Sequence, residues 1–358
     1  MARASQSAAA RATSDAAKRP APTQAQGAQS AHPGLMTVVA LAVVAAAVAA
    51  AAWMAGLPAQ SGFASSTNAA SSDRTDAPVA GDPSADTLLA SSTIALPWTV
   101  HNVACVDEYK PAVPGCTPAK CARIITDELC SADEAIRLRS MASRVMALGG
   151  GGGAPTILDL HTGALSKGSR FVNVYASLTA PRRAQLFPRQ DLALYTEIKD
   201  RIRAAIMKEF GLQQLFLTKP TFFSRIDGSK TAATLNDEYW HVHVDRTTYG
   251  SFVYTSLLYL SDFGVDFEGG EFAFVAEQDG TPLKHEQALS DDDGGLVTSA
   301  LIQPRLGRVS MFTSGPENPH HIRKVTKGIR FALTVSFTCD PTAAIADPSP
   351  SLLRLQTF

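Results

Sequence analysis

Alternating apolar and polar positions in the C-terminal third of the chain predict antiparallel β-strands. Short runs rich in aromatic and β-branched residues occupy 252–260, 269–275, 306–314 and 320–337, and glycine, aspartate and proline residues separate them. Runs of this kind are typical of a β-sandwich or barrel. In the last run one face carries Ile329, Phe331, Leu333, Val335 and Phe337, and the other carries Arg330, Ala332, Thr334 and Ser336. Arg330 therefore shares its face with small residues, which leaves room beside it for a ligand.

Two stretches have the periodicity of amphipathic helices. Ser131 and Glu134 form a capping box at the start of a run that continues to about Leu148. A second apolar pattern at helical spacing covers 191–210, and Gly211 is placed to end it. We expect both helices to pack on the outside of the β-rich domain, and we assign them no chemistry.

The N-terminal region predicts a membrane anchor. Residues 1–34 are rich in Ala, Ser, Gln and Pro without an apolar pattern, which indicates a disordered tail. Residues 35–57 carry no charge and are long enough to cross a bilayer. Positive residues precede this stretch and none follows before Arg74, so we expect a single-pass type II membrane protein with a signal anchor. The tail would be cytosolic, and the rest would lie in the lumen of the endoplasmic reticulum or Golgi.

A second interpretation of the N-terminal region stays open. Alanine, serine and arginine dominate the start of the chain and acidic residues are almost absent from it, as in a transit peptide. The alternative location is therefore an organelle, either a chloroplast or a mitochondrion.

Composition divides the rest of the chain. Residues 58–95 are rich in Ser, Ala and Asp and are expected to form a flexible linker. A cysteine-bearing segment with the first helix follows at 96–145, then the main β-rich domain at 146–342 and a tail at 343–358. The net charge is −1 and no basic cluster with interleaved aromatic residues occurs, which argues against a nucleic-acid partner.

All five cysteines follow the predicted anchor, at Cys105, Cys116, Cys121, Cys130 and Cys339. The first four lie close together and predict two disulfides in an oxidising lumen, with Cys339 left free. The sequence does not say which of them pair. A zinc site is the less favoured alternative, because the spacing lacks the usual Cys-x-x-Cys pair.

Three residues are candidate metal ligands. His243 and Asp245 are two apart, so on an extended backbone they point to the same face. His320, from a distant strand, would add a second imidazole. Two imidazoles and one carboxylate that leave coordination positions open are associated with non-haem Fe(II) oxygenases. The sequence therefore predicts a ferrous centre, with Arg330 placed to bind a carboxylate nearby.

Two neighbouring histidines compete with this assignment. His241 would share the strand face of His243 and Asp245, and we interpret it as a support for the ligands rather than a ligand. His321 is adjacent to His320, and only one of the two can face inward. Counting back from Arg330, we assign His320 to the metal.

Several stretches of the sequence resemble a known enzyme family. They are 157–165, 170–175, 217–226 and 248–252, together with the His-x-Asp pair, and the similarity covers roughly residues 120–340. The chain resembles the prolyl 4-hydroxylase-like branch of the Fe(II)/2-oxoglutarate dioxygenases. Within it, the nearest resemblance is to the family of 2-oxoglutarate and iron-dependent oxygenase domain-containing protein 3.

The resemblance implies an α+β fold with a double-stranded β-helix (jelly-roll, cupin-like) core and supporting helices. It implies that the catalytic residues His243, Asp245 and His320 bind Fe(2+), and that Arg330, Tyr259 and Thr255 bind the co-substrate 2-oxoglutarate. It also implies O2 as oxidant, ascorbate as a reductant, and a protein or peptide substrate hydroxylated with release of succinate and CO2.

Three alternatives to a prolyl hydroxylase are open. The first is hydroxylation of another residue, such as lysine. The second is a catalytically silent jelly-roll binding module. The presence of all four residues, His243, Asp245, His320 and Arg330, argues against it. The third is a cupin-type metal enzyme without 2-oxoglutarate, in which Arg330 and Tyr259 would meet no dicarboxylate.

Overall fold

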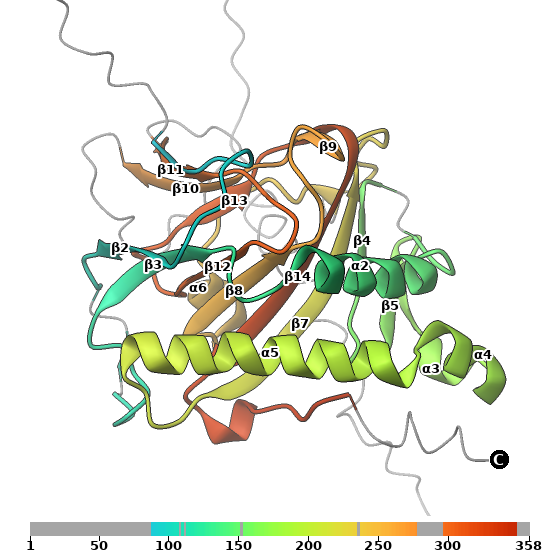
Figure 1. Ribbon diagram of the computed structural model, residues 1–358, viewed down its shortest axis with the longest axis horizontal. Helices are drawn as coiled ribbons and strands as arrows, with labels where there is room; N and C mark the ends of the chain where they lie inside the picture. The colour runs from blue at the N-terminus through green and yellow to red at the C-terminus, as the bar shows by residue number, and fades with distance from the viewer. Residues whose placement is uncertain are drawn as a thin grey trace, which may run out of the picture.

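The computed structural model describes residues 87–106, 109–110, 112–150, 153–234, 237–277 and 296–348, which form two facing β-sheets with the two longest helices on one side (Figure 1). The major sheet has the order β2-β3-β12-β8-β14-β7-β4-β5-β6, and β9 pairs with β14. Its strands are β2 (Thr99–Val103), β3 (Cys121–Thr126), β4 (Pro155–Leu158), β5 (Ala164–Lys167), β6 (Arg170–Asn173), β7 (Phe216–Asp227), β8 (Tyr254–Tyr259), β9 (Phe267–Gly269), β12 (Val309–Thr313) and β14 (Val325–Thr338).

The minor sheet has the order β1-β11-β10-β13. Its strands are β1 (Leu88–Ala90), β10 (Phe272–Glu277), β11 (Leu296–Ile302) and β13 (His320–Ile322). The helices are α2 (Ala132–Met146), α3 (Val174–Ser177), α4 (Ala180–Leu186), α5 (Arg189–Phe210) and α6 (Asp245–Tyr249), and a 3-10 turn, η2, covers Pro341–Ala343.

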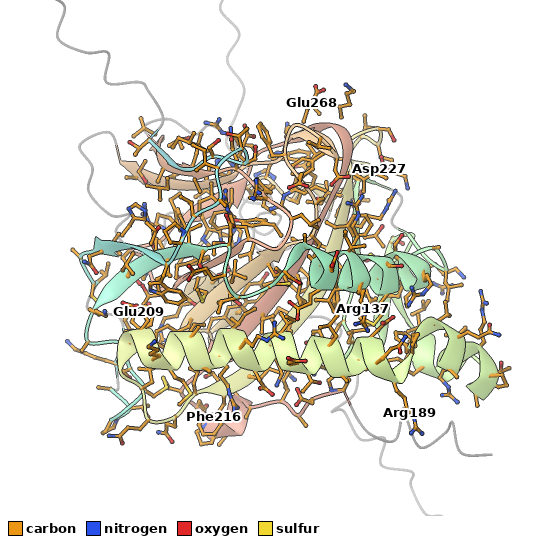
Figure 2. The ribbon with its side chains drawn as sticks, in the orientation of Figure 1. Arg137, Arg189, Glu209, Phe216, Asp227 and Glu268 are labelled. Atoms are coloured by element: carbon orange, nitrogen blue, oxygen red, sulfur yellow. A yellow bond between two sulfur atoms is a disulfide. The ribbon has the colours of Figure 1, made fainter. Side chains whose placement is uncertain are left out.

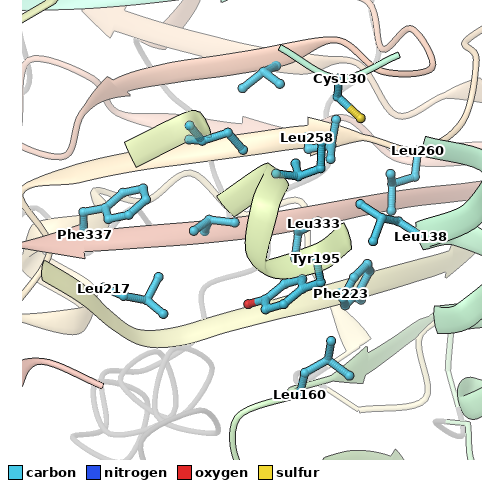
Figure 3. Packing of buried hydrophobic residues seen from close by; sticks show 14 of the residues in the cluster. Cys130, Leu138, Leu160, Tyr195, Leu217, Phe223, Leu258, Leu260, Leu333 and Phe337 are labelled. Atoms are coloured by element: carbon cyan, nitrogen blue, oxygen red, sulfur yellow. The ribbon is translucent and has the colours of Figure 1, made fainter. Parts of the chain in front are cut away.

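The major sheet separates two hydrophobic cores. On β14, the face that carries Phe331, Leu333, Val335 and Phe337 joins the large core beneath the helices, as its alternation predicts (Figure 3). The opposite face looks toward the minor sheet, where Tyr259 of β8 and Phe312 of β12 pack with residues of β10 and β11 in a second, smaller core. The resulting order is helices, major sheet, minor sheet. This arrangement agrees with the predicted two-sheet core and supporting helices.

Both predicted helices are confirmed. The capping box of α2 is present, because the Ser131 side chain accepts a hydrogen bond from the Glu134 backbone and the Glu134 side chain accepts one from the Ser131 backbone. α5 ends at Gly211, whose φ of 65° is a left-handed conformation that glycine adopts without strain. Both helices lie on the same side of the major sheet in Figures 1 and 2, with Arg137 labelled on α2 and Glu209 near the end of α5.

The last predicted strand is divided into two. β13 ends at Ile322 and pairs with β10 of the minor sheet, whereas β14 begins at Val325 and pairs with β7, β8 and β9. The prediction of one continuous strand over 320–337 was therefore wrong. Its physical consequence is that His320 and Arg330 lie on different sheets.

The predicted segment boundaries also change. β1 lies inside the expected linker 58–95, yet it pairs with β11, and Ala90 is buried. The segment 96–145 supplies β2, β3 and α2 to the same sheet and core as residues 146–342, so it is part of the same domain. The expected tail from 343 begins with residues that still contact the domain, because Ile345 donates a backbone hydrogen bond to Leu217.

The expected tail 1–34 and anchor 35–57 lie outside the described residues. Across the ranges given above, none of the helices is long and apolar enough to cross a membrane.

The disulfides differ from the prediction. Cys105 pairs with Cys121, and Cys116 pairs with Cys339, while Cys130 is a buried free cysteine. Two disulfides were expected, but confining them to the first four cysteines and leaving Cys339 free was wrong. The reason is that the end of β14 returns to the N-terminal segment, a contact between distant parts of the chain that spacing does not show.

Candidate metal centre

Three potential ligands from two distant segments meet between the sheets. Nε2 of His243 lies 3.6 Å from Oδ1 of Asp245, and Nε2 of His320 lies 3.7 Å from the same oxygen. One ligand atom from each residue lies within 4.8 Å of the others. Two imidazoles and one carboxylate at these separations could hold one divalent metal ion and leave coordination positions for other molecules.

The backbone that presents them is not the predicted strand. His243 forms an isolated antiparallel bridge with His320, with each backbone N–H donating to the carbonyl of the other at 3.0 Å. Val244 is extended, but Asp245 is the first residue of α6. The expectation of three side chains on one strand face was therefore wrong. Residue 241 lies in a bend. The His241 side chain bonds to Glu238 at 2.7 Å and is not one of the three potential metal ligands.

Backbone carbonyls orient both imidazoles. His243 Nδ1 lies 3.1 Å from the His241 carbonyl oxygen, and His320 Nδ1 lies 2.9 Å from that of Asn318. A proton on each Nδ1 leaves Nε2 free to accept a metal, which is the usual arrangement of metal-binding histidines. His321 is turned elsewhere, with its Nδ1 2.9 Å from the Trp240 carbonyl oxygen.

Burial and electrostatic interactions together set the protonation states of His320 and Asp245. His320 is 4% exposed, and its burial lowers its pKa to about 4, so its imidazole is neutral near pH 7. Burial opposes ionisation of Asp245, but its electrostatic interaction with His320 and its hydrogen bonds with His243 and Thr255 together lower its pKa below the usual value. A neutral imidazole and an ionised carboxylate are the ligand forms that metal binding requires.

Thr255 lies against the metal site rather than beside Arg330. Its hydroxyl donates a hydrogen bond of 2.6 Å to Asp245 Oδ2 and lies 2.8 Å from the Ser314 hydroxyl. Thr255 and Tyr259 do share a face of β8, but they are four positions apart, which on a strand is about 13 Å. The Thr255 hydroxyl therefore supports the Asp245 carboxylate, and its expected role in binding 2-oxoglutarate stays a prediction.

Arg330 is a fully buried cation with unused donors. Its Nε donates to the Gly270 carbonyl at 2.9 Å, but its two terminal nitrogens have no hydrogen-bond partner in the described part of the chain. The guanidinium carbon lies 5.6 Å from the ring centroid of Tyr259, and the Tyr259 hydroxyl lies 3.1 Å from that of Ser310. Burial lowers the pKa of Arg330, and Tyr259 and Tyr239 oppose that shift. A buried guanidinium without an anion is costly, so the arrangement favours an anionic ligand.

Several residues of the site were not found by sequence reasoning. Tyr239 accepts a hydrogen bond from the Val325 backbone at 2.8 Å; burial raises the pKa of its hydroxyl, and the charge of Arg330 opposes that shift. Three aromatic rings surround His320, with centroids 4.9 Å, 5.0 Å and 6.2 Å from its own, and they belong to Phe272, Phe312 and Phe274. The alternation Phe-x-Phe in 272–274 was a signal for an inward face, but nothing local pointed to His320.

Comparisons with known proteins agree with this chemistry. The family model of the 2OG-Fe(II) oxygenase superfamily matches residues 230–338. The 2-oxoglutarate and iron-dependent oxygenase domain-containing protein 3 of Xenopus tropicalis is 42% identical over 75% of this chain and 79% of that protein. The Homo sapiens protein of the same name is 44% identical over 69% of this chain and 72% of that protein. Homo sapiens prolyl 3-hydroxylase 2 is 29% identical over 61% of this chain and 30% of that protein.

Proposed function

This chain belongs to the family of 2-oxoglutarate and iron-dependent oxygenase domain-containing protein 3, and from that premise we propose that it hydroxylates a prolyl residue of a protein or peptide. It is a 2-oxoglutarate-dependent dioxygenase that uses Fe(II), 2-oxoglutarate and O2. The iron, when bound, supplies the oxygen chemistry that couples loss of CO2 from 2-oxoglutarate to oxidation of a C–H bond.

We assign the iron to His243, Asp245 and His320. This set fits a ferrous ion, because it offers two imidazole nitrogen donors and one carboxylate and keeps coordination positions free. Asp245 supplies the only formal charge among the three ligands. The Thr255 hydroxyl holds Oδ2 of Asp245, the oxygen that does not face the histidines, by a hydrogen bond. The backbone carbonyls of Asn318 and His241 orient the imidazoles of His320 and His243.

The observation that carries the proposal is the buried, unsatisfied guanidinium of Arg330. We assign its two terminal nitrogens to the distal (C5) carboxylate of 2-oxoglutarate, which would accept two parallel hydrogen bonds from them. Tyr259 forms one wall of that subsite, and its hydroxyl is within reach of Ser310. The bound co-substrate would be shielded from water by the aromatic residues of the smaller core.

Proline as the substrate rests on two similarities. Motifs of the chain resemble the prolyl 4-hydroxylase branch, and a related protein is named prolyl 3-hydroxylase 2. We propose that C4 of the proline is hydroxylated. The similarity to prolyl 3-hydroxylase 2 favours C3 as the alternative position. The alternative target within this enzyme class is a lysyl residue. The alternative outside it is a catalytically silent binding module.

We further propose that the enzyme is anchored by residues 35–57 with its catalytic domain in the lumen, and that ascorbate supports turnover. The anchor rests on the uncharged stretch and the positive residues before it. Extraction of membranes with alkaline carbonate should leave the full-length protein in the pellet, whereas release into the supernatant would contradict the anchor. Omission of ascorbate should shorten the time over which turnover continues.

One assay separates the alternatives. Full-length protein is supplied with Fe(II), 2-oxoglutarate, O2 and ascorbate, first alone and then with proline-rich and lysine-containing peptides, and succinate and peptide mass are measured. We expect succinate release that rises with a prolyl peptide and a mass gain of one oxygen located on proline. Oxygen on lysine would select the runner-up, and no succinate under any condition would favour the silent module.

A further inference from the structure

We propose that Arg123 and Tyr109, which precede the residues matched by the oxygenase family model, are positioning residues that hold the turn before His320 and so set its metal-binding orientation. The inference rests on the proposed function, because it takes His320 to be an iron ligand. Both side chains come from the cysteine-bearing N-terminal segment, and both contact residues of the turn 314–319.

Arg123 acts through Asn318. The Asn318 backbone carbonyl orients the His320 imidazole, and its side chain is 1% exposed. Nε of Arg123 donates a hydrogen bond of 2.7 Å to Oδ1 of Asn318, whose Nδ2 donates to the Thr313 carbonyl at 2.9 Å. The side-chain amide is thus hydrogen-bonded at both ends, which restricts the movement of the Asn318 backbone carbonyl that bonds to His320. Removing the Arg123 side chain would leave the Asn318 amide oxygen without this hydrogen bond.

Arg123 also contacts the aromatic surroundings of His320. Its guanidinium carbon lies 4.0 Å from the ring centroid of Phe274, a cation–π distance. Phe274 pairs with His320 across β10 and β13, and the two rings lie 6.2 Å apart. Arg123 therefore supports His320 on two sides, from the carbonyl that it bonds and from the ring beside it.

Tyr109 holds the start of the same turn. Its hydroxyl donates to Oε1 of Glu317 and accepts from the Gly315 backbone, each at 2.7 Å. A Cβ at Gly315 would lie 2.7 Å from that hydroxyl, so only glycine permits this close approach. Tyr109 lies between Cys105 and Cys121, which the first disulfide joins.

Supports of this kind govern metal affinity in other proteins, where loss of a residue that orients a ligand typically lowers affinity by about 10- to 100-fold. The readout for this inference is therefore metal affinity itself. Full-length protein is titrated with Co(II) in the absence of 2-oxoglutarate, and the dissociation constant and the visible spectrum of bound Co(II) are recorded. Urea unfolding of each variant is measured in parallel.

Arg123→Met and Tyr109→Phe should each weaken Co(II) binding by about tenfold and alter the spectrum. Arg137→Met and Tyr175→Phe are matched controls, because Arg137 pairs with Asp191 on the helical side and the Tyr175 hydroxyl bonds to the Leu160 carbonyl. They should leave Co(II) affinity unchanged even where they lower stability. If Arg123→Met does not fold, Arg123→Lys keeps the charge but not the Nε contact, and the same weakening is expected.

A double-variant cycle tests the route through Asn318. If Arg123 acts through that amide, adding Arg123→Met to Asn318→Leu should lower affinity little further than Asn318→Leu alone. Additive losses would overturn this route, and wild-type affinity in folded Arg123 and Tyr109 variants would overturn the inference. Failure of the wild-type protein to bind Co(II) would instead contradict the proposed metal site.

Discussion

Two arginines are fully buried in the described part of the chain, and they have opposite surroundings. Arg308 uses all of its nitrogens, donating to the Asp127 carboxylate and to the carbonyls of Ser91, Ile94 and Gln303. Arg330 leaves its two terminal nitrogens without a partner among the described residues. A satisfied guanidinium stabilises the fold, whereas an unsatisfied one lowers stability and favours a ligand.

Replacing these two arginines should therefore have opposite effects. Arg330→Met should raise the free energy of unfolding by about 1 kcal/mol or more and remove stabilisation by 2-oxoglutarate. Arg308→Met should lower it by about 3–5 kcal/mol, because the Asp127 carboxylate loses both hydrogen bonds from Arg308, and should leave stabilisation by 2-oxoglutarate intact. Urea unfolding in the presence of Mn(II), with and without 2-oxoglutarate at about 100 times its dissociation constant, measures the stability of each variant and its stabilisation by 2-oxoglutarate. The free energy of unfolding of the wild-type protein should rise by about 2.7 kcal/mol when 2-oxoglutarate is added. Stabilisation of Arg330→Met by the same amount would contradict the assignment.

The hydroxyl of Thr255 should matter for the metal and not for 2-oxoglutarate directly. Thr255→Val keeps the shape and removes the donor to Asp245, so Mn(II) affinity should fall by about tenfold. Thr221→Val is the matched control, since its buried hydroxyl bonds to the Thr218 carbonyl on β7. Isothermal titration of both variants measures the difference, and equal affinities would show that the Thr255 contact is dispensable.

The residue types of the site were predictable, but their supports were not. The His-x-Asp pair, His320 and Arg330 follow from the motif order and the family resemblance. The contact of Thr255 with Asp245 joins a strand to a helix, and the contact of Arg123 with Asn318 joins a strand to a turn. Such contacts depend on how the sheets face each other, and no local pattern encodes that.

At the scale of elements, local signals determined the helices better than the strands. The capping box and the glycine stop each act within a few residues, and α2 and α5 follow them closely. The run 320–337 shows the opposite case, because its division into β13 and β14 depends on two different partner strands. A strand's sheet is decided by long-range pairing, which alternation alone does not report.

The N-terminus of α2 offers a prediction at this scale. Ser131→Ala removes the side chain that caps the helix and should lower the free energy of unfolding by about 1 kcal/mol. Ser143→Ala, at an exposed position inside the same helix, should change it by no more than a few tenths of a kcal/mol. Urea unfolding of the two variants measures this, and metal affinity should not change in either. A loss for Ser143→Ala equal to that for Ser131→Ala would contradict the capping role.

At the scale of the whole molecule, the N-terminal segment is part of the catalytic domain. It supplies two strands of the major sheet and one helix, and Cys116 ties it to the end of β14 through Cys339. Sequence reasoning separated this segment from the domain, because its composition changes there and its partners lie far away in the sequence.

The two disulfides should differ in their contribution to stability. Cys116 and Cys339 are 223 residues apart and Cys105 and Cys121 are 16 apart, so chain entropy predicts that the longer link stabilises by about 2 kcal/mol more. Unfolding of the paired alanine variants Cys116→Ala/Cys339→Ala and Cys105→Ala/Cys121→Ala measures this. Under reducing conditions the difference should vanish. A larger loss from the shorter link would contradict the pairing or its entropic role.

The most direct test of the metal site is an anaerobic titration of the full-length protein with Fe(II) followed by 2-oxoglutarate. We predict one Fe(II) per chain, and one 2-oxoglutarate that binds only after the iron. Asp245→Ala should lose both, and Arg330→Met should keep the iron and lose 2-oxoglutarate. Wild-type Fe(II) affinity in Asp245→Ala would contradict the assignment of the metal to His243, Asp245 and His320.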